Sequence, residues 1–176
     1  MNQDRQEELK ADDVFRSVNA HAPIMMWMAG PDRDYRFLSE GWLRFTVRAL
    51  EQELGQGFVE NLHPEDREAA GQAYVDNFER RSPYEFEYRM RRHDGEYRWI
   101  LDRAAPYTLP SGEFGGFVGT CLDVTERRAE GEALKNLNAE LERRVEARTY
   151  ELQAVNKELE SFTYSVSHDL DRKSVV

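Results

Sequence analysis

Four histidines are the side chains of this 176-residue chain best suited to nucleophilic or metal-ligand chemistry. His168 stands directly before Asp169, and an imidazole that a carboxylate holds by hydrogen bonding can accept a phosphoryl group at a ring nitrogen. His21, His63 and His93 lack the HExxH or paired spacing of a metal site, and none is predicted. His63 precedes a proline at a helix start, which favours capping or packing over metal or haem ligation.

Composition narrows the functional classes further. With 40% hydrophobic residues the chain can bury a core, and 24 basic against 34 acidic residues give a net charge of −10. That charge argues against nucleic acid or an anionic membrane as a partner, since both favour a basic surface. One cysteine rules out an intrachain disulfide framework, and no apolar run is long enough to enter a membrane. We expect a soluble, cytoplasmic protein.

The last third of the chain predicts one long helix. No proline follows Pro110, and only Gly131 follows Gly119, so turn-forming residues are nearly absent. Apolar residues recur there with the 3,4 spacing of a coiled-coil seam, which predicts a parallel homodimer, with Asn138 and Arg148 as polar seam positions that fix register. The alternative is a helix that folds back on its own domain. The seam positions are Leu141, Val145, Arg148, Leu152, Val155, Leu159, Phe162 and Val166.

The preceding residues predict an α+β domain with a five-stranded antiparallel sheet and short helices on one face. Apolar runs at 24–28 and 35–38 predict a first hairpin, and helical spacing follows from 39 to 54. A further helix is expected to open at His63-Pro64-Glu65-Asp66, with proline in its first turn. Period-two alternation then predicts three long strands, beginning with Tyr84, Phe86, Tyr88 and Met90 on one face.

These residues resemble PAS domains with their C-terminal PAC motif, over roughly residues 12 to 128. The matching motifs are RFLSEGWLRFT, HPEDRE, EYRMRRHDGEYRWI and GFVGTCLDVTERR, in that order. Val47 departs from the pattern, since related sequences often have glycine there, which affects one helix turn. The resemblance implies a PAS fold and a sensory role.

A second resemblance, of ELESFTYSVSHDL at 158–170, is to the H box of bacterial sensor histidine kinases. It implies that His168 is the phosphoacceptor and that Asp169 assists it. In that family SHDL runs on into Arg and a Pro-Leu pair, whereas here DRKSVV follows and no ATP-binding boxes appear. This chain by itself is therefore expected not to be an enzyme, and the parent protein is expected to supply the ATP-binding domain and to act on a response regulator. Four segments follow: an amphipathic helix at 1–19, a PAS/PAC domain at 20–125, a coiled-coil signalling helix at 126–160, and a truncated phosphoacceptor helix at 161–176.

The family's ligand pocket lies between the sheet and its helices. An unknown small molecule is the candidate ligand, although the aromatic residues could equally fill a core. A light-driven flavin adduct is not expected, because Cys121 lies on the last strand rather than in the helix motif that flavin-binding members use. Haem is not expected either. The candidate pocket residues are Trp42, Phe45, Tyr74, Phe78, Tyr88, Trp99 and Phe117.

The segment Asp123-Val124-Thr125-Glu126 resembles the junction at which the last PAS strand passes into the output helix. Thr125 is expected to cap that helix through its hydroxyl, with Arg127 pairing nearby acids. The resemblance implies that Asp123, Thr125, Glu126 and Arg127 transmit strain from the sheet into the coiled coil. We therefore expect the sensory input module of a histidine kinase, and the alternative is a ligand-free PAS module for dimerisation or protein interaction.

Overall fold

The computed structural model describes residues 17, 19–21 and 24–173, with side chains through residue 163. The predicted helix at 1–19 lies almost wholly outside this range, although Ser17 and residues 19–21 are helical. The chain divides into two units, one ending at Glu126 and the other beginning at Arg127.

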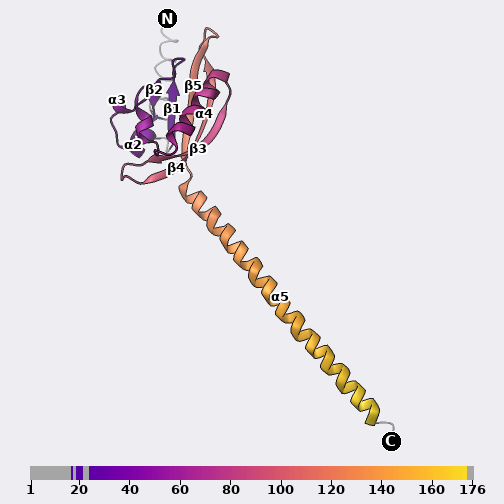
Figure 1. Ribbon diagram of the computed structural model, residues 1–176. Helices are drawn as coiled ribbons and strands as arrows, with labels where there is room; N and C mark the ends of the chain where they lie inside the picture. Colours follow the sequence, from indigo (N-terminus) through magenta and orange to yellow (C-terminus); the bar gives the residue numbers. More distant parts are fainter. Residues whose placement is uncertain (1–16, 18, 22–23, 174–176) are drawn as a thin grey trace. The chain divides into compact units, whose positions relative to one another are not determined.

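Five antiparallel strands form one sheet in the order β2-β1-β5-β4-β3. The N-terminal hairpin is thus joined to the other strands through the last strand, β5 (Figure 1). The predicted α+β class with a five-stranded antiparallel sheet is confirmed. The strands are β1 (Met25–Ala29), β2 (Tyr35–Leu38), β3 (Tyr84–Arg91), β4 (Tyr97–Thr108) and β5 (Phe114–Asp123).

Helices cover one face of this sheet. Trp27, Ile100 and Phe117 point from the strands into a single buried core, whereas Val118 and Leu122, on the opposite face of β5, are 39% and 52% exposed. The sheet therefore has an inner, helix-covered face and an outer face. The helices of this unit are α2 (Glu40–Thr46), α3 (Leu50–Glu53), the 3-10 helix η1 (Gly57–Asn61) and α4 (Arg67–Arg80).

A buried carboxylate ties the short helices together. Glu53 is fully buried and accepts hydrogen bonds from Trp42 Nε1 at 3.1 Å and Asn61 Nδ2 at 2.6 Å. Arg48 pairs with the same carboxylate, Nε to Oε1, at 3.1 Å. Because a buried charge is tolerated only when it is paired and hydrogen-bonded, this network fixes α2, α3 and η1 as one layer.

Two local expectations need correction or refinement. Helix α4 begins at Arg67, three residues after Pro64, because the carboxylate of the preceding Asp66 bonds Arg89 on β3 and makes no bond to its own helix. Helix α2 ends at Thr46, and the C-cap residue Val47 adopts a left-handed conformation with φ of 51°. That conformation suits glycine and is unusual for a β-branched residue, which explains the family's preference there.

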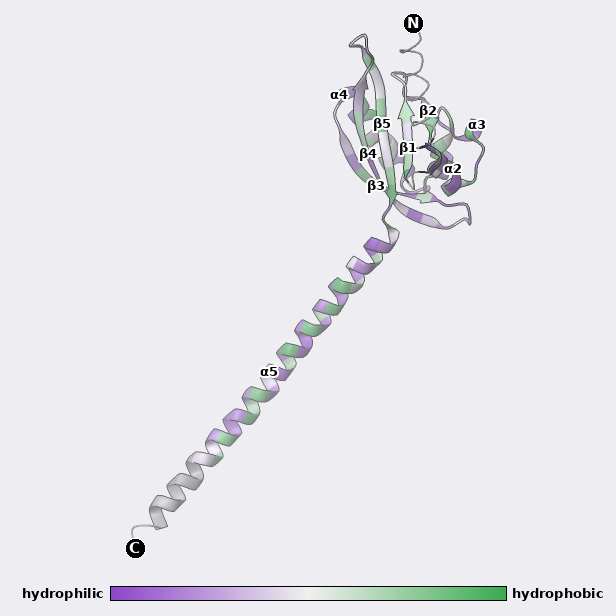
Figure 2. Cartoon of the chain, turned by 180° about the vertical axis from the view of Figure 1, so that it is seen from behind, coloured by the Kyte–Doolittle hydropathy of each residue, from purple (hydrophilic) through white to green (hydrophobic). Residues whose placement is uncertain are grey.

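The last element, α5 (Thr125–Lys173), is one continuous helix of 49 residues, as the scarcity of glycine and proline predicts. At 1.5 Å per residue it is about 74 Å long. Figure 2 shows apolar and polar positions alternating along it. Within the described residues, no helix combines the length and the apolar character that crossing a bilayer requires.

Candidate functional site

An internal cavity of about 200 Å³ lies between the inner face of the sheet and the layer formed by η1 and α4. Its aromatic wall comes from β2, η1, α4 and β3, so that residues far apart in sequence meet around it. Three polar side chains, Gln56, Arg67 and Asp102, also reach it. The aromatic wall consists of Tyr35, Phe58, Tyr74, Phe86 and Tyr88.

Asp102 is the buried acidic group of this cavity, with a side chain from the middle of β4. Only 2% of the residue is exposed, and Trp27 Nε1 donates a hydrogen bond to its Oδ1 at 2.9 Å. Burial raises the pKa of the carboxyl to about 7, and hydrogen bonds from Trp27, Cys121 and Tyr88 offset only part of that effect. The group therefore changes charge near neutral pH, which is characteristic of functional sites.

The tyrosine hydroxyls and the cysteine thiol near Asp102 stay neutral. Burial raises the pKa of the Tyr35 and Tyr88 hydroxyls well above their usual value, and it does the same for the Cys121 thiol. Tyr88 Oη and Cys121 Sγ lie 3.5 Å apart in hydrogen-bonding contact. Asp102 thus has neutral hydroxyl and thiol neighbours in a largely aromatic cavity, and Arg67 is the cationic side chain of the same cavity.

Of the seven predicted pocket residues, Tyr74 and Tyr88 line this cavity. Trp42 is buried against Tyr35 in the helical layer, and Phe45 is partly buried against the core. The remaining three lie elsewhere. Phe78 and Phe117 stack on each other in the core, and Trp99 stands under the guanidinium of Arg89.

The placement of Trp99 corrects its assignment as a pocket residue. Along β4, Ile100, Asp102 and Ala104 are the buried residues of the inner face, so the odd-numbered Trp99 points to the outer face. Residue types favour the opposite parity, because Tyr97, Trp99 and Leu101 alternate with Arg98, Ile100 and Asp102. The pairing of Ile100 with the inward Tyr88 sets the parity, and it places Asp102 inside.

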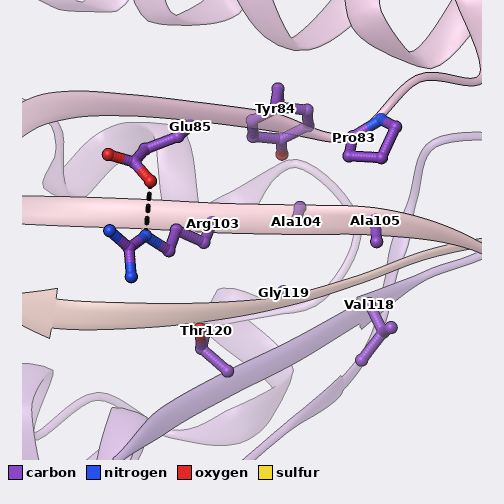
Figure 3. Close-up of a pocket in the computed structure, with 9 residues that line it drawn as sticks. All are labelled: Pro83, Tyr84, Glu85, Arg103, Ala104, Ala105, Val118, Gly119 and Thr120. Carbon is purple, nitrogen blue, oxygen red and sulfur yellow. Dashed lines mark hydrogen bonds and ion pairs between the residues drawn. The ribbon is translucent and has the colours of Figure 1, made fainter.

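A second, broader depression of about 540 Å³ lies over β3, β4 and β5, lined in part by Val118 and Thr120 (Figure 3). Its charged residues, Glu85 and Arg103, form an ion pair across β3 and β4, and both are largely exposed. Exposed pairs of this kind contribute little energy. The internal cavity, in contrast, holds the buried carboxylate of Asp102, so we take it as the candidate ligand site.

The residues around the start of α5 tie it to the sheet. Thr125 Oγ1 accepts a hydrogen bond from the Trp99 backbone N–H at 2.7 Å, and Asp123 Oδ1 accepts from the Thr125 backbone N–H at 3.0 Å. Thr125 therefore bonds β4, whereas the expected cap bonded its own helix. Arg98 on β4 pairs with Asp123 at 2.9 Å and with Glu126 at 3.4 Å. Arg127 is exposed.

A chain of contacts that the sequence did not predict links the start of α4 to this junction. Asp66, just before α4, forms two hydrogen bonds to the guanidinium of Arg89, at 2.9 and 2.6 Å. That guanidinium lies 5.4 Å from the ring of Trp99, whose backbone N–H bonds Thr125. The charge pair lowers the pKa of Asp66 through its hydrogen bonds with Arg89. Neither Arg89 nor Arg98 carries a motif signal strong enough to be selected from sequence.

The predicted seam residues of α5 are exposed in this single chain. Exposed fractions run from 48% at Leu141 to 69% at Leu152, and Arg148 pairs with Glu151 at 2.7 Å. Val166, His168 and Asp169 belong to α5, but their side chains lie outside the described residues. Of the other histidines, His63 accepts at Nδ1 from the Glu65 backbone N–H at 3.3 Å and packs edge-on against Tyr97, which agrees with the predicted packing role; it does not cap α4, which begins at Arg67.

Comparison with known proteins defines the family. The PAS fold family matches residues 35–121. A sensory box histidine kinase/response regulator from Burkholderia thailandensis is 30% identical, with a TM-score of 0.52, over 73% of this chain and 98% of that one. The N-terminal domain of a diguanylate cyclase with PAS/PAC sensor from Marinobacter aquaeolei is 20% identical, with a TM-score of 0.54, over 60% of this chain and 98% of that one. The chain belongs to the PAS family.

Two longer relatives extend the comparison. The uncharacterized protein y4lL of Sinorhizobium fredii is 38% identical over 130 residues, which are 73% of this chain and 16% of that protein. The peroxide stress-activated histidine kinase mak1 of Schizosaccharomyces pombe is 24% identical over 157 residues, 84% of this chain and 10% of that protein. The chain thus spans about a sixth or less of these relatives, one of which is a histidine kinase.

Proposed function

We propose that this chain is the sensory input module of a two-component histidine kinase. The PAS domain senses a small molecule in its internal cavity, and α5 carries the signal to His168 as the phosphoacceptor. The observation that carries this proposal is the hydrogen bond from Trp99 on β4 to Thr125 at the start of α5. A movement of β4 would thereby act directly on the first turn of the output helix.

The cavity and the junction share the same strand. Asp102 lies at the cavity, and Trp99, three residues earlier on β4, holds Thr125. Arg98, the residue before Trp99, forms ion pairs with Asp123 and Glu126. A ligand that shifts β4 therefore changes the contacts that anchor α5, provided that α5 has two arrangements close in free energy.

A second copy of the chain supplies those arrangements. The exposed apolar seam of α5 has the spacing of a parallel two-stranded coiled coil, and the polar Asn138 and Arg148 weaken it locally. A rotation or a register shift of the two helices would then change the position of His168. The ATP-binding domain and the response regulator are the expected partners in the parent protein. A flavin adduct is still not expected, because Cys121 lies on the last strand. Haem is not expected either, because His63 is better suited to packing than to ligation.

Native mass spectrometry of the full chain tests dimerisation and sensing together. We expect a dimer under gentle conditions and a monomer for Leu152→Asp, which places a charge in the seam. Gln153→Asp, one position away from the seam, is the matched control and should remain a dimer. A monomeric wild-type chain would remove the coiled-coil transmission step.

Phosphotransfer is tested separately with ATP and a complete histidine kinase of the same family. Label is expected on the wild-type chain and not on His168→Gln. Absence of label on the wild type would argue against the phosphoacceptor assignment. The alternative, a ligand-free dimerisation module, predicts a dimer in which no small molecule changes the melting temperature.

A further inference from the structure

The polar groups around the internal cavity are not equivalent. Gln56 Nε2 donates to the Arg33 carbonyl at 3.3 Å and to Asp34 Oδ1 at 3.2 Å. Arg67 donates through Nε to the Leu62 carbonyl and through Nη2 to the Glu60 carbonyl, each at 3.1 Å. These two side chains hold the η1–α4 wall in place, and their amide and guanidinium donors are directed at the protein itself.

Asp102 differs from both. It comes from the sheet side, Trp27 Nε1 donates to its Oδ1, and Cys121 and Tyr88 are further hydrogen-bond partners of the carboxylate. A carboxylate has two oxygens with room for about four hydrogen bonds, and it has no donor of its own when ionised. The cavity therefore presents a ligand with a buried acceptor, surrounded by aromatic rings, and a buried carboxylate gains most from a further donor.

The size of the cavity limits the ligand. An apolar cavity of about 150 Å³ is known to accommodate benzene, and this one measures about 200 Å³. One aromatic ring with a small substituent therefore fits. Tyr35 and Phe58, stacked with centroids 4.1 Å apart, and Tyr74 at their edge offer a flat ring the offset or edge-on contacts that aromatic pairs prefer.

We propose that the cavity binds a small, flat aromatic molecule that carries an N–H donor, an amine or amidine, with the donor hydrogen-bonded to Asp102. This inference rests on the proposed sensory function and narrows its ligand chemistry. At pH 8, where Asp102 is ionised, an aromatic acid of the same size is disfavoured, because two carboxylates in a cavity of low dielectric repel each other and the donors of Arg67 are directed at backbone carbonyls.

Benzamidine and benzoate are matched probes for this selectivity, since they share the ring and differ in the charged group. With the full chain at pH 8, we expect benzamidine to bind one per PAS domain by calorimetry and to raise the melting temperature, and benzoate to do neither at equal concentration. Asp102→Asn should weaken benzamidine at least tenfold, in line with a hydrogen bond to a charged group. Glu85→Gln, which removes an exposed carboxylate on the outer face, should leave binding unchanged.

Ala70→Leu is a second variant, because Ala70 lines the cavity and the larger side chain fills it. It should abolish benzamidine binding while the chain remains folded. The inference is overturned if wild type binds neither probe, if benzoate binds as well as benzamidine, or if Asp102→Asn or Ala70→Leu retains wild-type affinity. None of these results changes the expected dimerisation or the expected labelling of His168. The proposed function is therefore tested separately, by native mass spectrometry and by phosphotransfer.

Discussion

Replacement of Asp102 by Asn should change how the stability of the PAS domain depends on pH. The pKa of this carboxyl is about 7 in the folded chain, against 3.8 as its ordinary value, because burial disfavours the charged form. The folded state therefore holds a proton that the unfolded state has already released between those two values. Stability from this group is greatest at low pH and is lost as the pH rises towards 7.

The magnitude follows from the two pKa values. Each pH unit between them costs about 1.4 kcal/mol of folding free energy, and the slope fades once the folded carboxyl ionises near pH 7. Between pH 5 and pH 8 the wild-type chain should lose about 2.5 kcal/mol through Asp102 alone. Asn keeps an oxygen that can accept from Trp27 Nε1, has no ionisation, and should lose none of this.

Urea denaturation followed by tryptophan fluorescence measures the effect, because all three tryptophans precede residue 125. The informative quantity is the difference in unfolding free energy between Asp102→Asn and wild type, taken at pH 5 and at pH 8 and at one protein concentration. Contributions of groups other than Asp102 are common to both proteins and cancel in this difference. Glu85→Gln, which removes an exposed carboxylate on β3, is the control for the loss of one negative charge. A constant difference for Asp102→Asn would refute the raised pKa, and with it the argument that burial dominates at this site.

Three further substitutions test other parts of the structure. Val47→Gly should raise the unfolding free energy by about 1 kcal/mol by relieving the left-handed backbone, with Val47→Ala as a control that gains less; no gain in the glycine variant would contradict the strain. Thr125→Val should cost about 1–3 kcal/mol, because the Trp99 backbone N–H loses its acceptor, whereas Thr149→Val on exposed α5 should cost little; equal effects in thermal denaturation would refute the anchoring role. Asn138→Leu combined with Arg148→Leu should lower the dimer dissociation constant in sedimentation, and an unchanged constant would place these residues outside the seam.

Alternation and turn residues were sufficient to predict the strands. Tyr84, Tyr88 and Met90 are buried on β3 as period-two spacing requires, and Gly95 has the positive φ of 87° expected of the hairpin turn. These features are local, so a single sequence contains them. The long helix α5 is equally local, because it depends on the absence of turn-forming residues over 49 positions.

The cavity was predicted less well, because its walls depend on long-range pairing. Tyr74 and Tyr88 were found because their own elements have clear periodicity. Phe58 lies in a short 3-10 helix without such a pattern, and Tyr35 lies in a four-residue strand. Size and aromatic character alone could not separate residues that line a cavity from residues such as Phe117 that fill the core.

The burial of Asp102 was also not predictable from residue type. The polarity of Asp102 suggests that its face of β4 is exposed, and the size and aromatic character of Trp99 suggest that the opposite face is buried. Both residue types therefore suggested the wrong parity for β4. Tertiary pairing overrides both preferences: Ile100 faces Tyr88, and Trp27 from β1 supplies the donor that makes a buried carboxyl tolerable. A sequence that places an acid where an apolar residue would pack more stably retains it at an energetic cost, and such local conflicts are expected at functional sites. The conflict at Asp102 is the physical reason to look for a ligand there.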